Sequence, residues 1–224
     1  MKALADLVIE GKPAADIGTD HGFVPIHLIV SEKVPFVIMT DINEGPLGKA
    51  QSNLNRVGVL PQYYSLRLGD GLEPVRNAEV SSIVIAGLGA ETIIEILEKD
   101  LKKTKSFERL ILQPRKRPFL LREWLYDNNF IVNQEVLIKE DGKLCEIISA
   151  SPSDCPQMPG HDDYYLPEAL YNDPLFSEYL DVYIRRLKVV IDNLKNSKAG
   201  INKIDPWVER LSRAERLKNV KQGY

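Results

Sequence analysis

The sequence has few cysteines and no long apolar run. Its two cysteines, Cys145 and Cys155, form no C-x-x-C pair and no spacing typical of a metal site, so we expect two reduced thiols and no metal. No run reaches the roughly 18 apolar residues of a transmembrane helix, and the opening stretch MKALADLVIEGK is too short and too charged for a signal peptide. We therefore expect a cytoplasmic protein that does not interact with membranes.

The strict G-x-G-x-x-G dinucleotide fingerprint is also missing. In its place, residues 14–22 read AADIGTDHG, in which an apolar run ends at Asp16 and glycines follow at Gly18 and Gly22. Pro25 then opens a second apolar run, so the expected order is strand, glycine turn, helix. Such a turn lets the backbone approach a ligand, and a helix start offers unpaired N–H groups. Taken alone, the pattern is equally typical of a tight turn capped by an aspartate.

The charge is unevenly distributed along the 224 residues. The whole chain carries a net charge of -3, but residues 183–224 hold 11 Lys or Arg against 4 Asp or Glu. A basic appendage on an acidic body is typical of proteins that bind polyanions, and it is also typical of solvated coiled coils. The length and the hydrophobic content of 44% suit one domain of ordinary size with a smaller attachment.

Apolar runs and amphipathic stretches alternate through the first two thirds of the chain. Strands are predicted at 36–40, 65–68, 82–86 and 110–113, after a first one that ends at Asp16, and helices at 4–10, 26–30, 46–57, 91–101 and 119–126. This alternation predicts a parallel α/β sheet with right-handed crossovers. Residues 131–138 and 144–148 break the rhythm, and the Asp141-Gly142 pair between them predicts an antiparallel hairpin at the edge of the sheet.

The last third of the chain has a different period. Residues 151–167 are rich in Pro, Asp and Ser and suggest a linker, so we expect one domain at 1–155 and a second at 156–224. An apolar seam then runs through Phe176, Leu180, Tyr183, Leu187, Val190 and Leu194, and a second through Ile204, Trp207, Leu211, Ala214 and Leu217. Two helices that fold back as an antiparallel coiled-coil pair would bury both seams.

Four successive predicted strands end in glycine or acidic residues. These endings are Asp16–Gly18, Asp41–Asn43, Gly69–Gly71 and Gly87–Gly89. Ligands of parallel α/β sheets bind at the carboxyl ends of the strands, and Asp41 lies 23 residues past Gly18, where an acidic residue is expected to bind ribose hydroxyls. NAD would need only the first two endings, whereas an adenosine cofactor with a cationic group uses all four and suits the acidic edge.

The motifs resemble those of a known family. DIGTDHG, DINEGPL, RLGDGL, VIAGLGA followed by ETIIEIL, and LILQP occur in the order found in the bacterial tRNA adenine-N1 methyltransferases that act on adenine 22. The resemblance implies a Rossmann-like class I methyltransferase fold with a mostly parallel seven-stranded sheet, and a C-terminal helical coiled coil. It implies S-adenosylmethionine (SAM) as cofactor, tRNA as partner, and a monomer or weak dimer.

The resemblance also implies roles for particular residues. The implied cofactor-binding set is Asp16, Gly18, Asp20, His21, Asp41, Ile42, Asn43, Asp70, Gly71, Ala86, Gly87, Leu88 and Gly89. From the chemistry of the transfer we expect a catalytic set of Asp20, His21 and Phe23, in which Asp20 orients the adenine, Phe23 stacks on it, and His21 either assists or stabilises the turn. Apart from the resemblance, the basic residues after the fifth predicted strand and in the tail are expected to contact RNA phosphates, with solvated surface charges as the alternative: Arg115, Lys116, Arg117, Arg210, Arg213 and Lys221.

Three sites depart from the family pattern, at Gly22-Phe23, at Leu88 to Ala90 and at Arg115, where a cation replaces a neutral amide. Two alternatives therefore stay open. One is a non-catalytic RNA-binding protein that keeps the fold, and the other is a SAM-dependent methyltransferase of a small metabolite.

Overall fold

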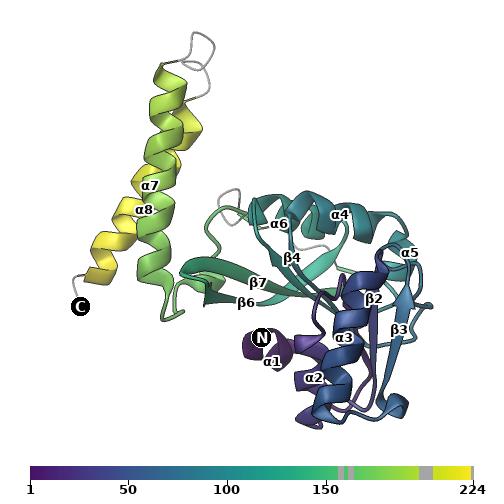
Figure 1. Cartoon of the computed structure of the whole chain (residues 1–224). Helices are drawn as coiled ribbons and strands as arrows, with labels where there is room; N and C mark the ends of the chain where they lie inside the picture. The colour runs from purple at the N-terminus through teal and green to yellow at the C-terminus, as the bar shows by residue number, and fades with distance from the viewer. Residues whose placement is uncertain (156–158, 161–163, 197–203, 223–224) are drawn as a thin grey trace. The chain divides into compact units, whose positions relative to one another are not determined.

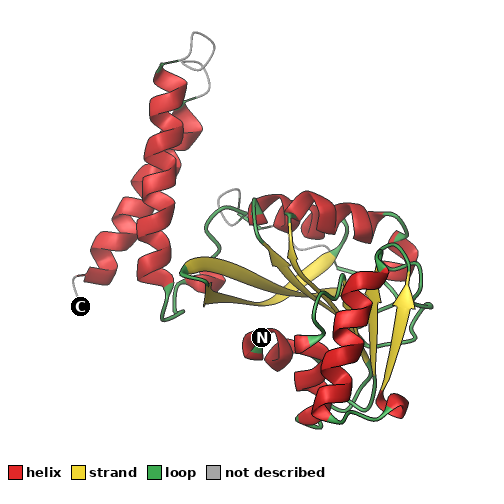
Figure 2. Ribbon diagram, in the orientation of Figure 1, coloured by secondary structure: helices red, strands yellow, loops and turns green. Residues whose placement is uncertain are grey.

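A seven-stranded sheet forms the centre of the first 165 residues (Figures 1 and 2). The computed structural model describes residues 1–155, 159–160, 164–196 and 204–222, with the backbone alone for 221 and 222. The strands are β1 (Ala14–Ile17), β2 (Val37–Asp41), β3 (Tyr64–Leu68), β4 (Ser82–Leu88), β5 (Arg109–Pro114), β6 (Phe130–Glu140) and β7 (Lys143–Pro152). They lie in the order β3-β2-β1-β4-β5-β7-β6, and β1 to β5 are parallel. The predicted fold class is confirmed.

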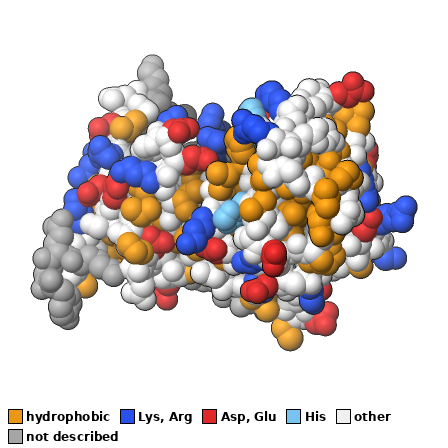
Figure 3. All heavy atoms as spheres, turned by 60° about the horizontal axis from the view of Figure 1, so that its bottom comes forward, with side chains coloured by type: hydrophobic (Ala, Val, Ile, Leu, Met, Phe, Trp, Pro, Cys, Tyr) orange, Lys and Arg blue, Asp and Glu red, His pale blue; other side chains and the backbone are white. Residues whose placement is uncertain are grey.

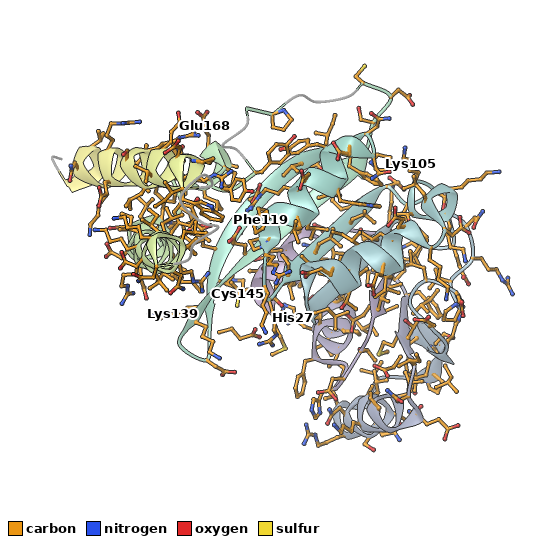
Figure 4. All side chains as sticks on the ribbon, turned by 90° about the horizontal axis from the view of Figure 1, so that it is seen from above. His27, Lys105, Phe119, Lys139, Cys145 and Glu168 are labelled. Carbon is orange, nitrogen blue, oxygen red and sulfur yellow. The ribbon has the colours of Figure 1, made fainter. Side chains whose placement is uncertain are left out.

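The hairpin of β6 and β7 closes one side of the sheet. β7 runs antiparallel to β5, with Ile111 opposite Ser149, and β6 pairs with the far side of β7. The predicted antiparallel hairpin is confirmed, although its second strand and not its first lies against β5. Buried Cys145 of this hairpin is labelled in Figure 4, whereas Cys155 is exposed.

Helices cover both faces of the sheet (Figure 1). They are α1 (Lys2–Leu7), α2 (Phe23–Val30), α3 (Glu44–Val57), α4 (Ala90–Glu98), α5 (Leu101–Thr104) and α6 (Pro118–Asp127), with a 3-10 turn, η1 (Pro61–Tyr63). Apolar residues of α1, α2 and α3 pack on one face in one core cluster, and those of α4 and α6 pack on the other face in a second cluster. The continuous apolar strands are buried on both sides for this reason.

Several helix boundaries differ from the prediction: α1 ends at Leu7 and not at Glu10, and α3 begins two residues early, at Glu44. Two further differences have local reasons. α2 begins at Phe23 because Gly22, with φ of +68°, forms the left-handed turn before it, and Pro25 falls in the first turn, where proline is tolerated. The helix expected at 91–101 is divided in two. The side chain of Asp100 accepts a hydrogen bond from the backbone N–H of Lys103 at 2.9 Å, so it caps a new helix, α5.

A buried ion cluster fixes the end of the first unit. Arg122 of α6 is fully buried and donates through Nε to Glu135 of β6 at 3.0 Å and through Nη2 to Glu146 of β7. Its Nη1 donates to the carbonyl of Tyr164 at 3.0 Å, and Tyr165 stacks on Phe119 with ring centroids 4.7 Å apart (Phe119 is labelled in Figure 4). Burial raises the pKa of Glu135 although the Arg122 charge acts in the opposite direction.

The chain divides into two compact units at a point later than the boundary expected from composition. The units are Met1–Tyr165 and Leu166–Tyr224, whereas the proline-rich stretch had suggested a boundary between 155 and 156. Tyr164 and Tyr165 belong to the first unit because their backbone and rings are held by α6.

The second unit consists of a 3-10 turn, η2 (Glu168–Leu170), and two helices, α7 (Phe176–Lys195) and α8 (Asp205–Gln222). Ion pairs join Lys188 to Glu215 at 2.9 Å and Lys218 to Asp181, which fits an antiparallel pair. The buried stripe of α7 consists of Phe176, Tyr179, Leu180, Ile184, Leu187 and Ile191. The seam is thus displaced from the predicted one, because Tyr183, Val190 and Leu194 are only half-buried.

Candidate functional site

A cavity of about 460 Å³ opens at the carboxyl edge of the sheet. Its wall is formed by the ends of β1, β2, β3 and β4 and by one face of α4. The lining residues are Ile17, Gly18, Thr40, Asp41, Ile42, Gly69, Asp70, Gly71, Leu72, Leu88, Thr92, Glu95, Ile96 and Lys99. β1 lies between β2 and β4, so the strand order reverses at this point, where open α/β sheets bind ligands.

The cavity brings together part of the predicted cofactor-binding set. Gly18, Asp41, Ile42, Asp70, Gly71 and Leu88 line it. Asp16, Asp20, His21, Asn43, Ala86, Gly87 and Gly89 do not line it, although each lies in or next to one of the same strand endings. The roles assigned to individual residues remain predictions.

The backbone holds the cavity wall in place. The N–H of Gly18 donates to the carbonyl of Thr40 at 2.9 Å, and the N–H of Gly69 donates to the carbonyl of Asp41 at 3.0 Å. One carboxylate oxygen of Asp41 accepts from the N–H of Asn43 at 2.8 Å, which orients the side chain at the end of β2. These bonds join β1, β2 and β3 at the edge, so the wall exists without a ligand.

Gly71 occupies a position that favours glycine. Its φ of +53° lies in the left-handed region, and a Cβ there would stand 2.9 Å from Cγ2 of Ile96. Both the backbone conformation and the close approach of α4 therefore disfavour a side chain at this position. The sequence signal Gly69-Asp70-Gly71 reflects this contact between the β3 loop and α4.

Asp16 lies beneath the cavity in the core. The hydroxyl of Thr19 donates to its carboxylate, and both side chains are buried. Burial raises the pKa of Asp16 to about 6, an effect that the Thr19 hydrogen bond opposes and the nearby Asp41 charge increases. Asp16 is therefore placed to hold the glycine turn rather than to face the open cavity.

The predicted catalytic residues form an exposed group at the start of α2. Asp20 makes an ion pair with Nζ of Lys49 at 3.0 Å, and Nε2 of His21 lies 3.1 Å from the other oxygen of its carboxylate. The His21 ring stacks on Phe23 with centroids 5.2 Å apart, and Phe23 is 48% exposed. The group presents a carboxylate and an aromatic surface to solvent side by side.

The loop after β5 carries three exposed cations. Nη2 of Arg115 lies 3.3 Å from Glu140, Nη1 of Arg117 lies 2.5 Å from Glu91, and the N–H of Arg115 donates to the carbonyl of Leu88 at 2.7 Å. Lys116 between them is exposed. Exposed ion pairs of this kind contribute about 0–1 kcal/mol, so incoming anions can replace the carboxylates at little cost.

Sequence reasoning missed the α4 wall. Lys99, just past the end of α4, lies 3.0 Å from Asp70 and 2.5 Å from Glu73, and its hydrogen bonds with Glu73 and Asp70 raise the pKa of Lys99. Thr92, Glu95 and Lys99 are spaced three and four residues apart, so they share a helix face. The spacing is visible in the sequence, but it does not indicate which face of the helix lies toward β3.

The helical unit carries three of the residues predicted to bind RNA, and all three roles remain predictions. Arg210 is only 8% exposed and its guanidinium lies 5.1 Å from the Trp207 ring, so its predicted contact with RNA stays a prediction that burial does not favour. Arg213 donates to the hydroxyl of Tyr171 at 3.0 Å and is partly exposed. The side chain of Lys221 lies outside the described residues. Basic and acidic side chains are interspersed on this unit in the face drawn in Figure 3.

Neither a metal site nor a membrane segment emerges from the residues that the structure describes. No group of three His, Cys, Asp or Glu side chains converges there to hold an ion. None of the helices described is both long enough and apolar enough to span a bilayer.

Comparisons with known proteins agree with this geometry. The model of a family described as a methyltransferase domain matches residues 1–148. The tRNA (adenine(22)-N(1))-methyltransferase of Bacillus subtilis is 36% identical over 154 residues, which make up 69% of this chain and 64% of that relative, slightly less than two thirds of its length.

Solved structures are similar over nearly the whole chain. The crystal structure of the B. subtilis m1A22 tRNA methyltransferase TrmK has a TM-score of 0.84 at 26% identity, covering 97% of this chain and 96% of that one. A Streptococcus pneumoniae protein solved in complex with S-adenosyl-L-methionine has a TM-score of 0.79 at 28% identity, covering 97% of each chain. The resemblance indicated by the motifs is confirmed.

Proposed function

Since this chain belongs to the methyltransferase-domain family, whose model matches residues 1–148, we propose that it transfers the methyl group of SAM to N1 of adenine 22 in tRNA. The observation that carries the proposal is the cavity at the switch point, which gathers Gly18, Asp41, Asp70 and Gly71 from three strand endings. The name of the B. subtilis relative supports the choice of substrate.

The cavity suits an adenosine with a cationic sulfur. Asp41 binds the ribose hydroxyls at the end of β2, and Asp70 accepts a hydrogen bond from the adenine amino group at the end of β3. Gly18 lets the backbone approach the methionine portion. Three carboxylates and a single ammonium group line the cavity, so the potential there favours the positive sulfonium over a pyrophosphate.

The reaction requires no base. The lone pair of adenine N1 attacks the methyl carbon, the C–S bond breaks with its electrons going to sulfur, and the positive charge passes from the sulfonium to the methylated adenine. Catalysis is mainly alignment of the two reactants, which is worth roughly 7–11 kcal/mol when the geometry is held. Asp20 offsets the charge that the adenine acquires, and His21 and Phe23 provide an aromatic surface for the flipped base.

The substrate is a folded polyanion, and the exposed cations suit it. Arg115, Lys116 and Arg117 contact phosphates near the strand ends. Arg213, and Lys221 as predicted from the sequence, contact phosphates from the helical unit. Because each phosphate contact releases counterions, affinity for tRNA falls linearly with salt on logarithmic axes. We further propose that the protein acts in the cytoplasm as a monomer or weak dimer.

The decisive experiment is mass spectrometry of nucleosides from unmodified tRNA incubated with the protein and SAM. The proposal expects 1-methyladenosine, and none from a matched tRNA in which adenine 22 is replaced by guanine. Binding of SAM and tRNA without methylation would favour a non-catalytic RNA-binding protein. SAM binding with no affinity for tRNA at low salt would favour an enzyme that acts on a small metabolite.

A further inference from the structure

Gln113 is a buried amide without a partner. It is the next-to-last residue of β5 and is only 3% exposed. Its Nε2 has no hydrogen-bond partner among the residues that the structure describes. Buried side-chain amides in folded proteins are almost always hydrogen-bonded, so a donor left unpaired at this depth requires an explanation, such as a bound water molecule or a ligand.

The pleat of β5 shows which way Gln113 faces. Side chains alternate between the two faces of a strand. Leu110 and Leu112 pack in the cluster with α4 and α6, whereas Ile111 packs in the cluster with α1, α2 and α3. Gln113 therefore faces the side of α2, whose first residue, Phe23, lies at the same edge of the sheet.

A bulge interrupts the sheet beside Gln113. Ala86 of β4 pairs with Gln113, but the next pair joins Leu88 to Pro114, so Gly87 has no partner on β5. Gly87 has a φ of +81°, which only glycine adopts readily. Bulges of this kind commonly lie beside active sites, where they end strand pairing and redirect the chain.

The unpaired amide, its orientation and the bulge beside it together indicate that Gln113 contacts the base that accepts the methyl group. This inference rests on the proposed function. We infer that the side-chain amide of Gln113 binds the target adenine on its N6–N7 edge, with Nε2 donating to N7 and Oε1 accepting from the N6 amino group. Glutamine and adenine form this bidentate pair with good geometry. It leaves N1, the attacking atom, unobstructed.

The pairing also explains why adenine is chosen. Guanine presents oxygen O6 in place of the amino group at this edge, so Oε1 would face an acceptor and the pair would break. Gln113 is thus a substrate-binding residue that sets base specificity, while the cavity at the switch point holds the cofactor.

The test uses tRNA in which adenine 22 is replaced by 7-deazaadenine, which lacks the N7 acceptor and keeps N1 and the amino group. The full-length wild-type protein should lose about tenfold in kcat/KM on this RNA, the effect of losing part of a bidentate contact. Gln113→Met, close in shape but without an amide, should lose about tenfold on ordinary tRNA and treat the two RNAs alike. Its Kd for SAM should stay within about twofold of the wild-type value.

Ser149→Ala is the matched control. Ser149 also carries a buried oxygen without a partner among the described residues, but it lies opposite Ile111, two residues farther from the carboxyl edge. This variant should keep both the rate and the discrimination between the two RNAs. Gln113→Leu supplies a second apolar replacement if the methionine variant does not fold.

The outcomes are separable. A wild-type protein that methylates both RNAs equally well, or a Gln113→Met variant that still discriminates, overturns the inference. A Gln113→Met variant that loses SAM affinity and keeps discrimination assigns the amide to the cofactor and likewise overturns it. If the wild type forms no 1-methyladenosine on ordinary tRNA, the proposed function itself fails, and the inference with it.

Discussion

The wall of the cavity and the exposed rim of the sheet edge, formed by the start of α2 and the loop after β5, are built in different ways. The wall, made of Gly18, Asp41, Asp70 and Gly71, is held mainly by backbone hydrogen bonds between strands and by the close approach of α4. The rim, made of Asp20, His21, Phe23, Arg115 and Arg117, is held by exposed ion pairs and one ring stack. A small ligand therefore meets a preformed pocket, whereas a large polyanion meets side chains that can exchange partners.

The largest expected effect concerns the buried carboxyl beneath the wall. The pKa of Asp16 is about 6 in the folded protein and 3.8 ordinarily, so the neutral form is favoured by folding. Its contribution to stability is complete below pH 3.8 and is lost as pH rises through 6, a loss of about 3 kcal/mol. Asp16→Asn should therefore raise the melting temperature at pH 7.5 and leave it unchanged at pH 3.5. An equal shift at both values would show that ionisation of Asp16 is not the cause.

The wall itself is most sensitive at Gly71. Gly71→Ala adds a Cβ 2.9 Å from Ile96 in a left-handed conformation, and strain of this kind costs about 1–3 kcal/mol. If the strain displaces the β3 loop, affinity for SAM should fall by up to about a hundredfold in calorimetric titration. Gly48→Ala is the control, because Gly48 lies in α3 with open space around it. Equal affinities of Gly71→Ala and Gly48→Ala for SAM would show that the β3 loop accommodates the added Cβ without being displaced.

A smaller loss of affinity for SAM is expected when Asp41 is replaced. Asp41→Ala removes the carboxylate proposed to bind the ribose, and a hydrogen bond to a charged group is worth about 1.5–3 kcal/mol. The Kd for SAM should rise by about thirtyfold, while Asp41→Asn, which keeps an acceptor, should show a smaller increase. A normal Kd for Asp41→Ala would place the ribose elsewhere.

Substitutions in the rim should lower kcat and leave the affinity for SAM unchanged. Asp20→Ala should bind SAM like the wild type and lose about tenfold in kcat, because the charge on the product adenine is no longer offset. Lys49→Met removes the partner of Asp20 without removing the carboxylate, and should change kcat by less than about threefold. Loss of SAM affinity in Asp20→Ala would assign Asp20 to the wall and erase the distinction between wall and rim.

The elements that sequence reasoning identified well are those fixed by local chemistry. Apolar runs gave the strands, and the glycine and acidic residues after them gave four strand endings at one edge, because parallel strands place their carboxyl ends together. Gly71 illustrates the limit of this reasoning. Its type is visible in the sequence, but its cause, the approach of Ile96, is a tertiary contact.

The features that were missed depend on how elements meet. Lys99 belongs to the cavity only because α4 crosses the β3 loop, and the burial of Arg210 depends on the packing of α8. Gln113 is a polar residue near the end of an apolar strand. The sequence alone does not distinguish it from any other polar residue at a strand end. Only its burial without a partner distinguishes it.

The position of β7 has a consequence for synthesis of the chain. β5 is bounded on one side by β4 and on the other by β7, so its second row of backbone N–H and C=O groups stays unpaired until residues 148–150 leave the ribosome. During that interval the apolar stretch Leu110–Leu112 forms an open sheet edge, which invites pairing with other chains. A nascent chain that stalls before the hairpin turn at Asp141-Gly142 therefore leaves this edge of β5 open to aggregation.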